Sequence, residues 1–113
     1  MAIKDIKMKE GLELELRSGG DKFLLFYSAW CPYCIEFTPA FEKIAASDAG
    51  VFSKVCIDEL PEVEDLFSIE VVPTVLFFRS GVVDRRLNGI EGVGLTAEGL
   101  ADFIFLCRGR GRH

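Results

Sequence analysis

Several features that mark other classes of protein are scarce in these 113 residues. No apolar run approaches the roughly 20 residues of a membrane-spanning helix, and residues 1–11 lack the continuous apolar stretch of a secretory signal. Acidic residues outnumber basic ones, 18 against 13, and the net charge of -5 argues against a general affinity for nucleic acid or anionic membranes. The sequence therefore predicts a cytoplasmic protein with no nucleic-acid or membrane partner.

Metal ligands are also few. The chain holds four cysteines and one histidine, whereas a structural zinc site takes four ligands, usually in closely spaced pairs. Cys31 and Cys34 form one such pair, but Cys56, Cys107 and His113 form no second one. We therefore expect no metal and no cofactor other than the redox-active Cys31–Cys34 pair. A zinc site and a purely structural disulfide are the lesser alternatives.

Apolar residues, by contrast, are abundant. Half of the residues are hydrophobic and ten are Phe, which is enough to build the core of one domain without disulfide staples. We expect a single domain over 1–113, with an N-terminal segment 1–20, a core 21–106 and a basic, flexible tail 108–113.

The order of the apolar patterns predicts an α/β domain. Segment 2–7 predicts a short strand, while 11–17 fits a strand or a helix, because Leu and Glu alternate there. Further strands are predicted at 23–27, 51–57, 74–78 and 82–87, and helices at 32–46, 61–67 and 96–107. Parallel βαβ pairing followed by an antiparallel hairpin gives a central mixed sheet of four to five strands, with helices on both faces.

The main chemical motif is Cys31-Pro32-Tyr33-Cys34. It follows an apolar strand at once and opens an amphipathic helix, where Pro32 suits the first turn. A cysteine at a helix N-terminus lies near unpaired N–H groups that favour its thiolate, so Cys31 is the candidate nucleophile. Cys34, one turn deeper, is placed to resolve a mixed disulfide. A CxxC in a βαβ context is itself a recognised redox pattern.

Several segments, in order, resemble the thioredoxin family. They are Trp30 before the motif, Pro39 inside the helix, Val55 to Asp58, Val72-Pro73-Thr74 and, more weakly, Val93-Gly94-Leu95. The resemblance covers about residues 20 to 105 and implies the thioredoxin fold, with a cis bond before Pro73. It also implies protein disulfides as substrates, a thioredoxin-reductase-like electron donor and a monomer. The implied substrate-binding residues are Trp30, Pro32, Tyr33, Val72, Pro73, Thr74 and Gly94.

Two departures from the family pattern stand out. Leu25 occupies the position of the family's buried Asp, the proton relay for the second cysteine, so Lys54 loses the partner that the resemblance implies. Removal of the Cys34 proton then falls to water or to another carboxylate, for which Glu36 is a weak candidate. The Pro-Tyr dipeptide of the motif resembles glutaredoxins, which suggests a potential less reducing than that of a standard thioredoxin.

Two other functions stay open at this point. One is a glutathione-dependent, glutaredoxin-like oxidoreductase, and the other is a non-enzymatic redox-sensing binding module. Cys56 and Cys107 are expected to be core residues. Tyr33 either gates the site or is an exposed spacer.

Overall fold

The computed structural model describes residues 3–110. Its elements follow in the order β1 (Lys4–Ile6), α1 (Lys9–Arg17), β2 (Asp21–Tyr27), α2 (Pro32–Ala45), a 3₁₀ turn (Ala46–Asp48), β3 (Phe52–Cys56), α3 (Glu62–Leu66), β4 (Thr74–Arg79), β5 (Val82–Leu87) and α4 (Ala97–Arg110). The segment that fitted either a strand or a helix is thus helix α1.

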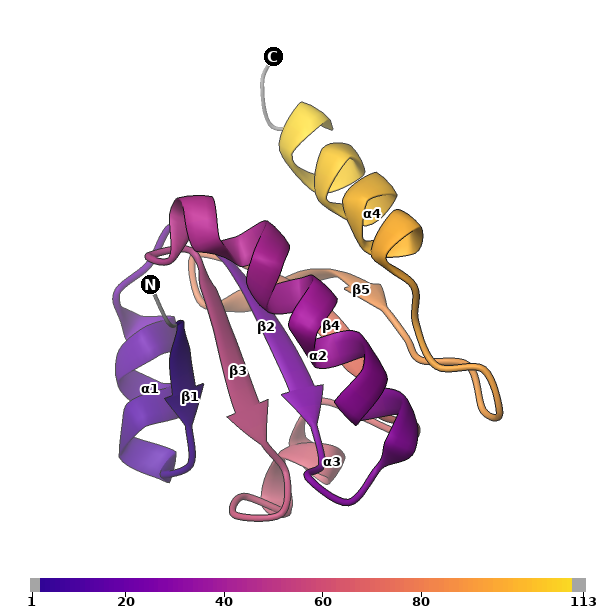
Figure 1. Ribbon diagram of the computed structural model, residues 1–113. Coiled ribbons are helices and arrows are strands. Elements are labelled where there is room, and N and C mark those ends of the chain that lie inside the picture. The colour runs from indigo at the N-terminus through magenta and orange to yellow at the C-terminus, as the bar shows by residue number, and fades with distance from the viewer. Residues whose placement is uncertain (1–2, 111–113) are drawn as a thin grey trace.

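The strands form one mixed sheet in the order β1-β3-β2-β4-β5 (Figure 1). Strand β3 pairs in parallel with both β1 and β2, whereas β4 runs antiparallel to both β2 and β5. Ser80 and Gly81 link β4 to β5 with positive φ angles of 54° and 83°, the backbone that suits a tight hairpin. The expected parallel half and antiparallel hairpin are both confirmed.

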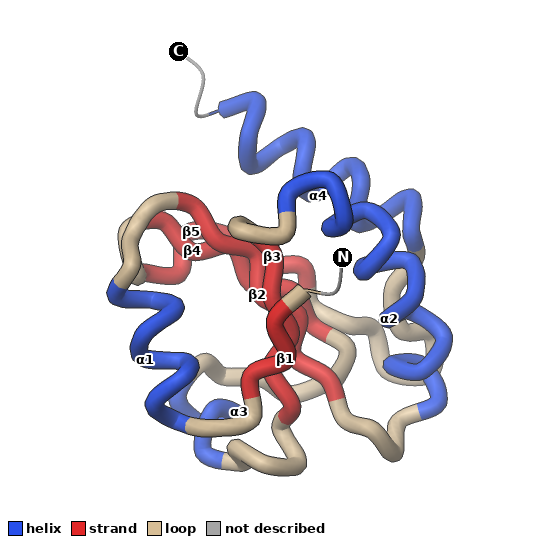
Figure 2. The backbone as a smooth tube through the Cα atoms, turned by 60° about the vertical axis from the view of Figure 1, so that its left-hand side comes forward, coloured by secondary structure: helices blue, strands red, loops and turns tan. Residues whose placement is uncertain are grey.

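Helices cover both faces of the sheet. Figure 2 shows the sheet nearly edge-on, with α1 and α3 on one side and α2 and α4 on the other. Side chains alternate along β2, so Phe23 and Leu25 join the core under α2 and α4, while Leu24 and Phe26 join the core under α1 and α3. A central strand buried on both faces explains its uninterrupted apolar run.

The end of the sheet far from the CxxC motif is rich in aromatic rings. The ring of Phe23 stacks on that of Phe52, with 4.9 Å between the ring centroids, and its centroid lies 4.7 Å from that of Phe77. Arg108 lies over the Phe23 and Phe52 rings and forms an ion pair with Asp48 at 2.7 Å. This cluster joins α4 to the sheet.

Part of the expected flexible tail 108–113 is helical, while its flexibility stays a prediction. Helix α4 continues to Arg110, because the Arg108 side chain is held by Asp48 and the aromatic rings. Arg112 and His113 lie outside the residues that the structure describes. The N-terminus of α4 agrees with the sequence prediction, since Thr96 Oγ1 accepts a hydrogen bond from Gly99 N–H at 3.0 Å.

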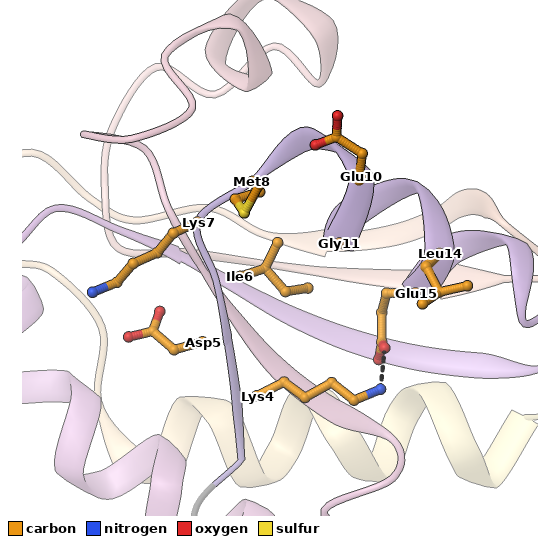
Figure 3. A pocket seen from close by; sticks show the side chains of 9 residues that line it. All are labelled: Lys4, Asp5, Ile6, Lys7, Met8, Glu10, Gly11, Leu14 and Glu15. Carbon is orange, nitrogen blue, oxygen red and sulfur yellow. Dashed lines mark hydrogen bonds and ion pairs between the residues drawn. The ribbon is translucent and has the colours of Figure 1, made fainter.

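Helix α1 buries one charged side chain that the sequence pattern did not single out. Glu15 is 3 % exposed, and its carboxylate accepts a hydrogen bond from Lys4 at 2.8 Å (Figure 3). It accepts a second one from Ser53 at 2.9 Å. Lys22 lies 3.6 Å away. Burial opposes its charge, but the hydrogen bonds and the two lysines outweigh burial and lower the Glu15 pKa.

Candidate active site

The CxxC motif lies where β2 ends and α2 begins. Cys31 is the N-cap residue of α2, and its sulfur accepts a hydrogen bond from Cys34 N–H at 3.3 Å. Pro32 stands at the first helical position, where no N–H is needed. Both cysteines are free thiols in this structure. The two sulfurs therefore belong to the first turn of one helix, as the sequence predicts.

The two thiols differ in accessibility. Cys31 is partly exposed, whereas Cys34 is 1 % exposed. Burial raises the pKa of Cys34 to about 12, with Cys31 and Asp58 adding to the rise, while the N–H of Ser28, 3.5 Å from the Cys34 sulfur, lowers it. Cys31 is thus the more accessible of the two thiols.

The Val72–Pro73 bond is cis, in agreement with the resemblance. This segment lies directly against the motif, because the Cys31 thiol donates to the Val72 carbonyl at 3.6 Å. The Thr74 hydroxyl donates to the Val71 carbonyl at 2.6 Å and accepts from Gly89 N–H at 3.1 Å. Thr74 therefore fixes the backbone next to Cys31.

The expected substrate-binding residues fall into two groups. Trp30, Pro32 and Tyr33 are exposed and Val72 is partly buried, so all four can meet a substrate. Pro73, Thr74 and Gly94 are buried. The Thr74 hydroxyl already has hydrogen-bond partners within the loop, and substrate binding by these residues stays a prediction.

Tyr33 is tied to the loop after β5. Its hydroxyl donates to the Gly92 carbonyl at 3.0 Å. Gly94, with a φ of 83°, comes so close that a Cβ there would lie 2.9 Å from Tyr33 Cβ. Glycine is needed at this position both for the backbone angle and for the space. The Tyr33 side chain thus contacts this loop through its hydroxyl and its ring.

Exposed apolar side chains lie on the residue that precedes Cys31 and on the loop that contacts Tyr33. Trp30 is 85 % exposed, and Val93 and Ile90 on the loop after β5 are each 60 % exposed. Exposed apolar side chains in one place usually mark a contact surface, and the partly exposed Cys31 belongs to the same end of the molecule.

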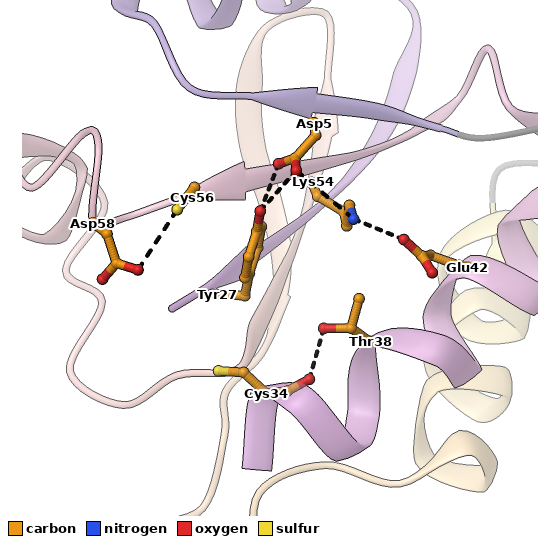
Figure 4. Close-up of polar contacts among 8 residues, drawn as sticks. All are labelled: Asp5, Tyr27, Cys34, Thr38, Glu42, Lys54, Cys56 and Asp58. Carbon is orange, nitrogen blue, oxygen red and sulfur yellow. Dashed lines mark hydrogen bonds and ion pairs between the residues drawn. The ribbon is translucent and has the colours of Figure 1, made fainter. Parts of the chain in front are cut away.

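An apolar side chain, Leu25, occupies the position of the family's buried Asp. Leu25 is fully buried in the core beneath α2 and cannot carry a proton. Lys54, its neighbour on β3, instead pairs with Glu42 at 2.7 Å and Asp5 at 3.9 Å. Figure 4 shows Lys54 between these carboxylates, with the Tyr27 hydroxyl turned to Asp5. Burial, followed by the bond to Asp5, raises the Tyr27 pKa well above its usual value.

Asp58 is a site residue whose role sequence reasoning missed. It follows β3, and its carboxylate accepts hydrogen bonds from the Ser28 hydroxyl at 2.8 Å and Ala29 N–H at 2.9 Å. These bonds lower the Asp58 pKa. Glu36, the weak candidate near Cys34, is exposed on α2 and has no side-chain hydrogen bond within the described part of the chain. The signal for Asp58 was its place directly after a buried strand.

Two hollows lie in different parts of the molecule. One, of about 310 Å³, borders Cys34 and is also lined by Tyr27, Thr38 and Pro39. A larger one, of about 450 Å³, lies between β1 and α1 and contains no cysteine (Figure 3). The first is the one relevant to thiol chemistry. Over residues 3–110 no cluster of side chains suits a metal ion, and no helix is long and apolar enough to cross a membrane.

Comparisons with known proteins agree with this geometry. The family model "Thioredoxin" matches residues 7–104. The chain is 32 % identical to a thioredoxin of Mycoplasmoides gallisepticum over 90 residues, which is 78 % of this chain and 90 % of that protein. It is 35 % identical to Thioredoxin H4 of Arabidopsis thaliana over 75 residues, or 65 % of this chain and 63 % of that protein. A crystal structure of a poplar thioredoxin h superimposes with a TM-score of 0.81 at 23 % identity, covering 96 % and 97 % of the two chains.

The chain carries a dithiol at the start of a helix, on a five-stranded mixed sheet covered by four α-helices, and the matching family model and relatives place it in the class of thiol-disulfide oxidoreductases. The chain belongs to the thioredoxin family. The family's disulfide-reductase activity therefore applies to the Cys31–Cys34 pair, and the family implies protein disulfides as its substrates.

Proposed function

We propose that this protein reduces protein disulfides with Cys31 as nucleophile and Cys34 as resolving thiol. The observation that carries these roles is the contrast between the two sulfurs: Cys31 caps the helix and is partly exposed, while Cys34 is buried. A substrate disulfide can reach Cys31 between the exposed Trp30 and the partly buried Val72. It cannot reach Cys34 first.

The reaction proceeds in two exchanges. The Cys31 thiolate attacks one sulfur of the substrate disulfide, which forms a mixed disulfide and releases the other substrate sulfur as a thiolate. Cys34 then loses its proton to solvent and attacks the Cys31 sulfur. This closes the Cys31–Cys34 disulfide and releases the second substrate sulfur, so the substrate gains the two electrons that the protein loses.

Three finer statements belong to this proposal. The electron donor that restores the dithiol is a thioredoxin-reductase-like enzyme, and the protein acts as a cytoplasmic, single-domain monomer. The Pro32-Tyr33 dipeptide, of glutaredoxin type, raises the midpoint potential above the thioredoxin value of about -270 mV. Support for the last statement is the likeness of this dipeptide to that of the glutaredoxins, whose potentials are about -200 to -230 mV.

Insulin reduction tests the proposed roles. With dithiothreitol as the electron source, the protein is expected to speed insulin precipitation, and Cys31→Ser is expected to lower the rate by more than about a thousandfold. Cys34→Ser should instead accumulate a mixed disulfide visible as an added mass. If Cys34→Ser accumulates none while Cys31→Ser does, the two roles are reversed.

The same preparation distinguishes the other functions. Turnover with glutathione but not with a thioredoxin reductase would identify a glutaredoxin-like enzyme. No reduction of insulin or of any model disulfide, together with a measurable midpoint potential, would identify a redox-sensing binding module.

A further inference from the structure

Hydrogen bonds to the Asp58 carboxylate hold the segment that precedes the CxxC motif. Ser28 and Ala29 both donate to its carboxylate, and the Ser28 oxygen accepts from Trp30 N–H at 3.2 Å. The Cys56 thiol adds a longer contact at 3.7 Å (Figure 4). One side chain after β3 thus fixes the backbone between β2 and α2.

The same segment supplies a donor to the resolving thiol. The N–H of Ser28 points to the Cys34 sulfur at 3.5 Å, and donation to sulfur favours the thiolate over the thiol. With Leu25 in the core, no carboxylate of β2 lies beneath Cys34 to take its proton. Stabilisation of the Cys34 thiolate then depends on this N–H more than it would where a buried Asp is present.

Resting on the proposed function above, we propose that Asp58 is a positioning residue for the resolving step. It holds Ser28 so that the Ser28 N–H meets the Cys34 sulfur as this sulfur becomes a thiolate. Asp58 acts through Ser28 and takes no proton itself; the proton goes to solvent. The new bond is Cys34–Cys31, the broken bond is Cys31–substrate, and the electron pair leaves with the substrate sulfur.

Asp58 also acts on Cys34 in the opposite sense through its negative charge. The ionisable groups around the Cys34 thiol are Cys31 on its own helix, Asp58 after β3 and Tyr27 at the end of β2, whose hydroxyl is engaged by Asp5. The Val71–Thr74 segment brings no ionisable side chain. A test must therefore remove the charge and the hydrogen bonds of Asp58 separately.

Asp58→Asn and Asp58→Ala make that separation. Both remove the charge, but Asn retains an oxygen for Ala29 N–H and an amide for the Ser28 oxygen, whereas Ala retains neither. Glu59→Ala is the matched control, because it removes a neighbouring exposed carboxylate that has no side-chain hydrogen bond within residues 3–110. Ser28→Ala removes the hydroxyl bond and leaves the Asp58 charge and the Ser28 N–H in place.

The measurement is stopped-flow reaction of the reduced protein with one equivalent of 5,5′-dithiobis(2-nitrobenzoate) from pH 6 to 10. Attack by Cys31 releases the first thionitrobenzoate, and attack of Cys34 on the mixed disulfide releases the second. The rate of the second phase, relative to that of the first, depends on the fraction of Cys34 that is thiolate. Its pH profile is a readout that a purely structural role of Asp58 does not move.

At pH 7 we expect the second phase of Asp58→Ala to be about tenfold slower than that of Asp58→Asn. This is the effect of losing one hydrogen bond to a charged group, here the bond from Ser28 N–H to the Cys34 thiolate. The first phase and the Glu59→Ala profile should stay within about twofold of the wild type. Equal second phases in the Ala and Asn variants would overturn the proposal, since Asp58 would then act by charge alone. If Asp58→Ala does not fold, Ser28→Ala decides: a slower second phase supports the proposal and an unchanged one overturns it. A wild type with no second release contradicts the proposed function instead.

Discussion

The two ends of strand β3 hold carboxylates in opposite environments. Near its start, Ser53 donates to Glu15, which is buried and paired with two lysines. Just past its end, Asp58 is exposed and accepts hydrogen bonds from the segment that precedes the CxxC motif. The buried carboxylate supports the fold, whereas the exposed one orders a reactive loop. The comparison indicates that stability and chemistry are placed at opposite ends of one sheet.

The sharpest expected contrast within the active-site end is between Cys31 and Cys34. Burial raises the pKa of Cys34 to about 12, so this thiol stays protonated at pH 8. Iodoacetamide at pH 8 should therefore modify Cys31 at least about a hundredfold faster than Cys34 or the buried Cys107, as peptide mapping by mass spectrometry can show. Equal labelling of Cys31 and Cys34 would contradict the difference between the two sites.

At the opposite end, the aromatic cluster carries stability. Phe23→Leu removes the ring that stacks on Phe52 and leaves a cavity between the sheet and α4. We expect a loss of about 2 kcal/mol in the free energy of unfolding, measured by urea denaturation. Turnover per folded molecule should not change. A variant with normal stability and lowered turnover would break the division between the two ends.

Glu15→Ala is expected to lower the free energy of unfolding by about 2 kcal/mol at pH 7, because it removes the carboxylate that Lys4 and Ser53 contact. The Glu15 pKa is lowered in the folded state from 4.5, so its contribution is fully present above that value and is lost as the pH falls through the folded pKa. The difference in the free energy of unfolding between Glu15→Ala and the wild type, measured by urea denaturation, should therefore become smaller below pH 4.5. The exposed neighbour Glu13 gives the control Glu13→Ala, expected to change stability by less than about 0.5 kcal/mol.

The smallest expected effect is at Tyr33. Tyr33→Phe keeps the ring against Gly94 and deletes the bond to the Gly92 carbonyl. We expect kcat/KM for insulin reduction to change by about threefold, with unchanged stability, since the hydroxyl lies at an exposed site. A change above about thirtyfold would show that the loop at 90–94 takes part in the reaction itself.

Local patterns were enough to predict much of the fold and the motif. The run at 23–27 is apolar because β2 is buried on both faces, and the cysteines follow it at once. Segment 11–17 could not be assigned, because Leu and Glu alternate there while Leu12, Glu15 and Leu16 also share one helical face. A charged residue on the buried side hides that face from a hydrophobicity pattern.

Contacts between distant segments could not be predicted in the same way. Asp58 lies thirty positions after Ser28, and Lys54 finds Glu42 and Asp5 only once α2 and β1 are placed on the sheet. The sequence shows at Leu25 that the family's proton relay is missing, but it does not show that Ser28 and Asp58 lie beside Cys34. Their positions depend on the register between β2 and β3, which places the end of β2 beside the loop that follows β3.

The most direct test of the central claim is the midpoint potential of the Cys31–Cys34 pair, measured in a dithiothreitol or glutathione redox buffer by mass shift after thiol trapping. We predict a single two-electron transition between about -280 and -180 mV, and within this window a midpoint above the thioredoxin value of about -270 mV. A pair that never closes, or that shows no transition in this window, would contradict the assignment of Cys31 and Cys34 as a catalytic dithiol.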